Sequence, residues 1–204
     1  MGSYVLLVTF WLAYGVLHSV LANNVVKRFF EQKMGAGYRF YRLIYNGLAF
    51  VLLAAILFYQ FTLPAQSLWA FDWRIDLLGN FLKYGGLLIV MIAISGYNFK
   101  EFSGLTFSPS DSKPGSGTLK TNGMLHYVRH PIYTGTILFI WGLFLSDSLV
   151  RTLLMAACVT VYTLIGIYFE EQKLVAEFGE AYRVYRRTVP MLFPKVFHKK
   201  AAPE

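Results

Sequence analysis

Residues 149–169 read LVRTLLMAACVTVYTLIGIYF, a run in which Arg151 is the only charged residue. A transmembrane helix needs about 20 predominantly apolar residues, so this run is long enough to cross a bilayer. Because unpaired backbone groups are not tolerated in hydrocarbon, the crossing segment is expected to be a helix. Two adjacent carboxylates, Glu170 and Glu171, follow the run and mark the point where the helix meets water.

Four other apolar stretches precede this run, at residues 4–22, 43–63, 77–97 and 132–145. The last is short, and the polar break at residues 146–148 predicts a tight hairpin between it and the run 149–169. The sequence therefore predicts an all-α fold, an integral membrane bundle of five transmembrane helices. No Lys or Arg precedes the first stretch, so we expect an uncleaved helix there and not a signal peptide.

The composition supports a membrane protein over a soluble domain. Of the 204 residues, 56% are hydrophobic and only 15% carry a charge, whereas ordinary globular chains are about 45–50% apolar and about 25% charged. The chain has a single cysteine, Cys158, which excludes an internal disulfide scaffold.

The net charge of +8 also fits a nucleic-acid-binding protein, so the placement of the charges has to decide. Of the 19 Lys and Arg residues, 16 lie in residues 23–42, in residues 99–131 or after residue 169. The positive-inside rule places these three segments in the cytoplasm. Five helices, with the N-terminus outside and the C-terminus cytoplasmic, place all three basic segments on the cytoplasmic side. No nucleic-acid partner is therefore needed to explain the charge.

The chain divides near a Gly-, Pro- and Ser-rich stretch at residues 106–123. Residues 1–105 would form an N-terminal three-helix membrane part. Residues 106–204 would form a region with the two-helix hairpin and a cytoplasmic tail, and both parts belong to one folded unit. The sequence leaves the oligomeric state open.

The segment before the fourth stretch is the first candidate site. Pro131 suits the first turn of a helix, so Arg129 and His130 should sit at a helix N-terminus, where positive partial charge favours an anion. The alternative is an Arg-rich border that snorkels to lipid phosphates. His126 and His130 have the spacing of a metal pair, but the proline interrupts helical phasing and no metal is expected.

Glu170 and Glu171 form a second candidate site, since carboxylates at the end of an apolar helix are costly unless they are paired or hydrated. They could bind the ammonium of a ligand, or they could simply be solvated. In the tail, Gly179 is expected to end the helix. Tyr182 and Tyr185 share one face of a following helix, where they either belong to the interfacial aromatic belt or wall an aromatic ligand.

An ordered set of motifs carries a family resemblance. It comprises Arg129-His130-Pro131, Tyr133, Glu170-Glu171, Leu174, Phe178-Gly179, Tyr182, Tyr185, Val189-Pro190 and Pro194, with Gly117, Thr121 and Gly123 as the lead-in. The region at residues 115–194 closely resembles the isoprenylcysteine carboxyl methyltransferase-like and phospholipid methyltransferase membrane enzymes. Upstream, residues 17–22 with 26–27, and residues 38–46, resemble the bacterial branch that includes methanethiol S-methyltransferase-like and nitrite-reduction-associated membrane proteins.

The resemblance implies a methyltransferase of the bacterial inner membrane that uses S-adenosylmethionine and takes a lipophilic small-molecule or lipid acceptor from the membrane lipids. The acceptor would be a thiol, a carboxylate such as that of prenylcysteine, or an amine. Arg129 and Glu171 would be the catalytic residues. Arg129 and His130 would hold the cofactor's carboxylate, although Arg129 could instead orient the acceptor. Glu170 or Glu171 would face the cationic parts, and the adenosyl group would be enclosed by Tyr127, Tyr133, Tyr182 and Tyr185.

Two other functions remain open from the sequence. One is a nicotinamide-dependent membrane reductase of related fold, and the other is a non-catalytic accessory protein of nitrogen-oxide metabolism. His18, within the first apolar stretch, is either a packing residue between helices or a catalytic group.

Overall fold

The computed structural model describes residues 2–95 and 119–194, and within these residues every regular element is a helix. Four long α-helices are α1 (Gly2–Ala22), α3 (Tyr41–Thr62), α4 (Trp73–Ser95) and α7 (Val150–Phe178). The shorter ones are α2 (Asn24–Met34), α6 (Pro131–Asp147) and α8 (Glu180–Thr188), with two 3-10 turns, η1 (Gly35–Phe40) and η3 (Gly123–His126). The all-α prediction is confirmed.

Among the described residues, four helical segments are long and apolar enough to cross a bilayer: α1, α4, α7, and α3 together with the end of η1. Their outward side chains include Phe50, Phe58 and Phe81, each more than 70% exposed, as expected of surfaces that face lipid. The fourth apolar stretch, at residues 132–145, also forms a helix, α6, but its 17 residues extend only about 25 Å. Length and composition alone therefore identify four spans and not five.

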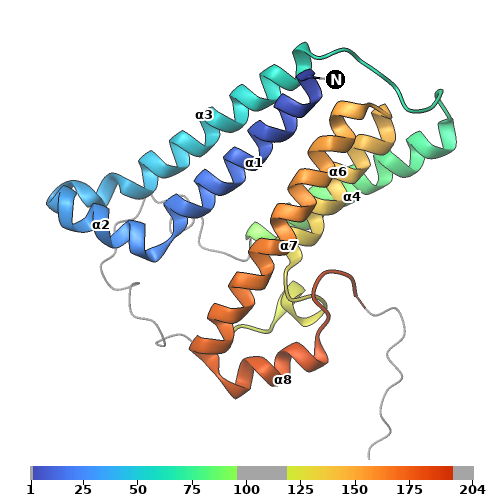
Figure 1. Ribbon diagram of the computed structural model, residues 1–204. Coiled ribbons are helices and arrows are strands. Elements are labelled where there is room, and N and C mark those ends of the chain that lie inside the picture. Colours follow the sequence, from blue (N-terminus) through green and yellow to red (C-terminus); the bar gives the residue numbers. More distant parts are fainter. Residues whose placement is uncertain (1, 96–118, 195–204) are drawn as a thin grey trace, which may run out of the picture.

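The α4 and α6 helices pack with their backbones in direct contact (Figure 1). Glycines seven residues apart make this possible on both helices, at Gly79 and Gly86 of α4 and at Gly135 and Gly142 of α6. A Cβ atom at Gly86 would lie 2.5 Å from the carbonyl oxygen of Gly135. The small residues thus replace side-chain interdigitation with close backbone approach, as in other membrane helix pairs.

The α1 helix packs between α3 and α7, and an apolar cluster joins the three helices. This cluster consists of Leu7, Trp11, Ile56, Leu63 and Met155. Beside it, the Arg151 guanidinium donates hydrogen bonds to the carbonyls of Gln60, Phe61 and Leu63. Arg151 therefore caps the C-terminal end of α3 by binding its last carbonyls.

The connection between α3 and α4 lies beside the hairpin between α6 and α7. Ser67 pairs with Leu149 in an isolated antiparallel bridge, and the Ser148 hydroxyl donates to the carbonyl of Trp69 at 3.3 Å. The predicted hairpin is confirmed, with Ser148 in the left-handed region at φ 54°. The two connections therefore share one end of the molecule.

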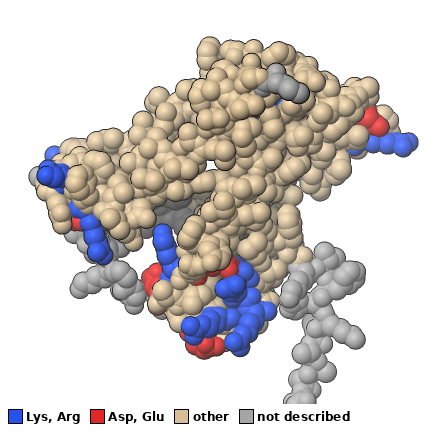
Figure 2. All heavy atoms as spheres, in the orientation of Figure 1, with Lys and Arg blue, Asp and Glu red and all other residues tan. Residues whose placement is uncertain are grey.

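At the opposite end, α2 and α8 extend away from the long helices (Figure 1). The α7 helix continues past Glu171 to Phe178, and Gly179, at φ 56°, ends it as expected before α8 begins. Figure 2 shows Lys and Arg side chains gathered over α2 and α8 and at the start of α4, while the long helices present a broad uncharged surface on this face.

Candidate active site

Glu171 stands at the centre of a buried charged cluster near the end of α7. Its Oε1 atom accepts a hydrogen bond from Nε of Arg129 at 2.7 Å, and Oε2 lies 3.3 Å from Nε of Arg186 on α8. The Nε2 atom of His130 is 3.3 Å from Oε1. The side chains of Arg129 and Glu171 are each only 8% exposed. Such a pair is tolerated in a dry site because each charge has several partners.

Arg129 also holds the chain that follows α8. Its Nη1 donates to the carbonyls of Val189 at 2.6 Å and of Arg186 at 3.1 Å. The backbone N–H groups of Arg129 and His130 donate to the carbonyls of Pro190 and Met191. The two backbone N–H groups that precede α6 are therefore bonded to the protein's own chain.

Two of the four candidate tyrosines, Tyr133 and Tyr182, lie near carboxylates of the protein. The Tyr133 hydroxyl donates to Oε2 of Glu170 at 2.9 Å. Tyr182 is only 1% exposed, and its buried hydroxyl makes no hydrogen bond with the described residues. Burial, with the nearby Glu171 carboxylate, raises the pKa of Tyr182 to about 12, while the Arg129 guanidinium opposes the rise. Tyr182 is therefore a neutral phenol beside the charged cluster.

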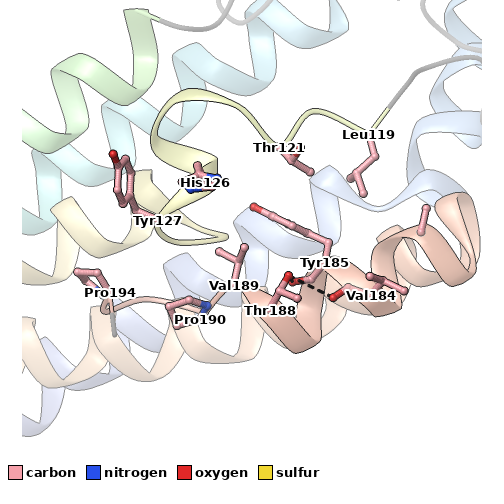
Figure 3. Close-up of a pocket in the computed structure, with 11 residues that line it drawn as sticks. Leu119, Thr121, His126, Tyr127, Val184, Tyr185, Thr188, Val189, Pro190 and Pro194 are labelled. Atoms are coloured by element: carbon pink, nitrogen blue, oxygen red, sulfur yellow. Dashed lines mark hydrogen bonds between the residues drawn. The ribbon is translucent and has the colours of Figure 1, made fainter. Parts of the chain in front are cut away.

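A cavity of about 590 Å³ lies between the segment before α6 and the segment formed by α8 and the chain after it (Figure 3). Its lining combines aliphatic, aromatic and hydroxyl side chains with one imidazole: Leu119, Thr121, His126, Tyr127, Ala181, Val184, Tyr185, Thr188, Val189, Pro190 and Pro194. This volume falls in the range of sites for small molecules and cofactors.

The structure thus separates the predicted site residues into two neighbouring groups. Tyr127 and Tyr185 line the cavity. Arg129, His130 and Glu171 lie together in the charged cluster, which fixes the chain at Val189 and Pro190 that forms one cavity wall. Charged residues before the fourth stretch and at the end of the fifth were expected to converge, and they do so as a direct ion pair.

Sequence reasoning missed two residues. Arg186 contacts Glu171, and its only signal was its place one residue after Tyr185 in a basic helix. His126 lines the cavity, although its spacing to His130 raised only the question of a metal pair. Within residues 2–95 and 119–194, no three His, Cys, Asp or Glu residues are arranged to hold a metal.

The residues of the cavity fit S-adenosylmethionine in kind. Its adenosyl part needs aromatic and apolar walls, which Tyr127, Tyr185, Val184 and Pro190 supply. Its amino-acid part carries a carboxylate, which needs hydrogen-bond donors, and an ammonium, which needs acceptors; the cavity offers an imidazole and hydroxyl groups, which can serve as either.

Comparison with known proteins identifies the chemistry. The sequence model of the phospholipid methyltransferase family matches residues 75–181. Methanethiol S-methyltransferase of Crocosphaera subtropica is 31% identical over 196 residues, covering 91% of this chain and 72% of the relative. The enzyme of the same name from Pseudomonas deceptionensis is 29% identical over 199 residues, covering 94% of this chain and 72% of its own length.

A second kind of methyltransferase matches a shorter region. Protein-S-isoprenylcysteine O-methyltransferase of Schizosaccharomyces pombe is 40% identical over 81 residues, covering 38% of this chain and 34% of the relative. These relatives favour a methyltransferase over the reductase and the non-catalytic accessory protein. The chain belongs to the phospholipid methyltransferase family and is a membrane methyltransferase.

Proposed function

We propose that the protein transfers the methyl group of S-adenosylmethionine to a small thiol that reaches the site from the membrane. The observation that carries this proposal is the cofactor-sized cavity beside the Arg129–Glu171 cluster, in a chain of which more than 90% matches relatives named methanethiol S-methyltransferases. The relative named for a prenylcysteine acceptor matches little more than a third of this chain, so a thiol is the better supported acceptor.

The proposed topology has five spans, with the N-terminus outside, the C-terminus cytoplasmic and the protein in the bacterial inner membrane. The pairing of Ser67 with Leu149 supports it, because it puts the start of α7 beside the connection between α3 and α4. If α6 did not cross, α7 would have to start on the other side of the bilayer. The cavity then lies at the cytoplasmic face, where S-adenosylmethionine is available.

In the proposed mechanism the cavity residues bind and orient the cofactor, and the charged cluster maintains the shape of the cavity. When bound, S-adenosylmethionine supplies an electrophilic methyl group on a sulfonium. Tyr127 and Tyr185 would pack against its adenosyl part. Arg129 and Glu171 act as positioning residues, since together they fix the chain at Val189 and Pro190.

The acceleration expected of such a site comes mainly from positioning and from exclusion of water. The thiol loses its proton to water, and the resulting thiolate would take the methyl group as its bond to the sulfonium breaks, leaving a neutral thioether and S-adenosylhomocysteine. This transfer requires neither a metal nor a covalent enzyme intermediate. The apolar walls of the cavity suit a reaction in which opposite charges neutralise each other.

The test is to measure two properties of the detergent-solubilised protein. Calorimetry should detect binding of S-adenosylhomocysteine, and incubation with methanethiol and methyl-tritiated S-adenosylmethionine should release labelled dimethyl sulfide. Labelling of a prenylcysteine analogue or of phosphatidylethanolamine, with none of methanethiol, would overturn the choice of acceptor. Failure of S-adenosylhomocysteine to bind would overturn the proposed use of the cofactor.

A further inference from the structure

The cavity is lined by five polar side chains, and two of them, Tyr185 and Thr188, are already bonded to the protein. The Tyr185 hydroxyl donates to the carbonyl of Leu125 at 2.6 Å. The Thr188 hydroxyl donates to the carbonyls of Tyr185 at 3.0 Å and of Val184 at 3.3 Å. Each hydroxyl would therefore have to break its present hydrogen bond before it could donate one to a ligand.

His126 differs from these residues. Its imidazole lines the cavity, as Figure 3 shows, and packs edge-on against the Tyr127 ring with centroids 5.3 Å apart. Within the described part of the chain, no hydrogen bond engages either ring nitrogen. Of all the lining residues, His126 alone can carry a positive charge.

The two cationic candidates from the sequence are engaged elsewhere. The Arg129 guanidinium binds Glu171 and two backbone carbonyls. His130 is only 6% exposed and lies against the same carboxylate. Neither is among the residues that line the cavity. An anionic group that enters the cavity therefore meets the imidazole of His126 and not the guanidinium of Arg129.

We propose that His126 binds the carboxylate of the amino-acid part of S-adenosylmethionine. This assignment rests on the proposed function, since it requires the cofactor to occupy the cavity. It makes His126 a cofactor-binding residue, and it gives Arg129 the separate task of holding the cavity wall. Tyr127, which packs on the imidazole, orients the ring from the side.

The experiment compares two ligands that differ in the amino-acid part. S-Adenosylhomocysteine carries it, whereas 5′-methylthioadenosine keeps the nucleoside and the sulfur but lacks the carboxylate and the ammonium. Calorimetry on the full chain in detergent would measure both affinities for the wild type and for His126→Ala. A hydrogen bond to a charged group contributes about 1.5–3 kcal/mol, so we expect His126→Ala to weaken S-adenosylhomocysteine about tenfold or more and to leave 5′-methylthioadenosine unchanged.

Two further variants sharpen the comparison. His126→Gln, which keeps a side-chain donor, should recover part of the lost affinity. Asn122→Ala changes an exposed neighbour outside the cavity lining and should bind both ligands as the wild type does. Lys120→Ala tests the cation that lies next in sequence to the lining residues Leu119 and Thr121.

The outcomes separate this inference from the proposed function. If the wild type binds S-adenosylhomocysteine and His126→Ala binds it equally well, the assignment of His126 is wrong while the function stands. Equal weakening of both ligands would place His126 on the nucleoside and also overturn the assignment, as would a selective loss in Lys120→Ala alone. If the wild type binds neither ligand, the proposed function fails and this inference fails with it.

Discussion

Glu171 is the residue on which the charged cluster depends, because it is the carboxylate shared by Arg129, Arg186 and His130. Glu171→Gln keeps the shape of the side chain but leaves the Arg129 guanidinium buried without its counter-charge. Breaking a buried ion pair in this way costs about 3–5 kcal/mol. We expect the variant to unfold at lower temperature and to bind S-adenosylhomocysteine more weakly, as measured by a thermal shift in detergent and by calorimetry.

Glu177 on the same helix provides the matched control. It is exposed, so Glu177→Gln should change neither the thermal midpoint nor the affinity. If Glu171→Gln proved as stable as Glu177→Gln, the ion pair would not be what holds the chain after α8 in place.

Tyr182 allows a prediction about pH. Burial raises its pKa to about 12 from an ordinary value of 10, so the folded protein keeps the phenolic proton after the unfolded chain has lost it. This contribution to stability is full below pH 10 and is lost as the pH rises from 10 towards 12. In Tyr182→Phe the thermal midpoint should therefore fall less between pH 9 and pH 11 than it does in the wild type.

The same variant is expected to be tolerated near neutral pH. The hydroxyl that it removes is buried and has no hydrogen-bond partner among the described residues, so its loss leaves no partner unsatisfied and should change the stability by less than about 1 kcal/mol. If the thermal midpoint fell equally in Tyr182→Phe and in the wild type between pH 9 and pH 11, the phenol would not titrate as its burial implies.

For single residues, the sequence predicted that Arg129 and Glu171 belong to one site, but not that they form an ion pair with each other. The charges of Arg129 and Glu171 and the motifs around them indicated one shared site. Their mutual pairing depends on where α8 and Pro190 return in space, which no spacing in the sequence specifies. His126 was overlooked for the same reason, since it becomes a cavity residue only when α8 forms the opposite wall.

Among the contacts between helices, the one between α4 and α6 can be tested by a single substitution. Gly86→Ala would place a methyl group 2.5 Å from both the carbonyl oxygen of Gly135 and the backbone nitrogen of Phe139, and the two helices would have to move apart. Overpacking of this kind costs about 1–3 kcal/mol. The measurement is the free energy of unfolding in mixed detergent micelles.

The adjacent Gly85 is the control, because a Cβ atom there would meet nothing within 4 Å. Alanine is a better helix former than glycine by about 1 kcal/mol, so Gly85→Ala should be neutral or slightly stabilising. Equal losses in Gly85→Ala and Gly86→Ala would attribute the effect to the α4 helix itself and not to its contact with α6.

The helices themselves were largely predictable, whereas their pairing was not. Apolar length specifies α1, α3, α4 and α7, since each run has to satisfy its own backbone in lipid. The glycines of α4 and α6 are visible in the sequence, but a small residue on an apolar helix gives the same pattern whether it faces lipid or another backbone. The choice of partner follows from the three-dimensional fit of both glycine pairs.

The membrane topology is the prediction that concerns the whole molecule. In a Cys158→Ser background, which removes the only native thiol, we would place single cysteines at the exposed residues Ala65, Gln32 and Glu177. Ala65 lies between α3 and α4, so an impermeant maleimide should label it in intact cells. The cysteines at Gln32 in α2 and Glu177 in α7 should react only after the membrane is permeabilised.

The side of the membrane on which Glu177 lies distinguishes five spans from four, because that side depends on whether α6 crosses the bilayer. With five spans, Glu177 shares the cytoplasmic side with Gln32, where the charged residues of α2 and α8 gather. With four spans, the end of α7 would lie on the side opposite Gln32, and the maleimide would label Glu177→Cys in intact cells. That result would also place the cavity away from the cytoplasmic supply of S-adenosylmethionine and so contradict the proposed function.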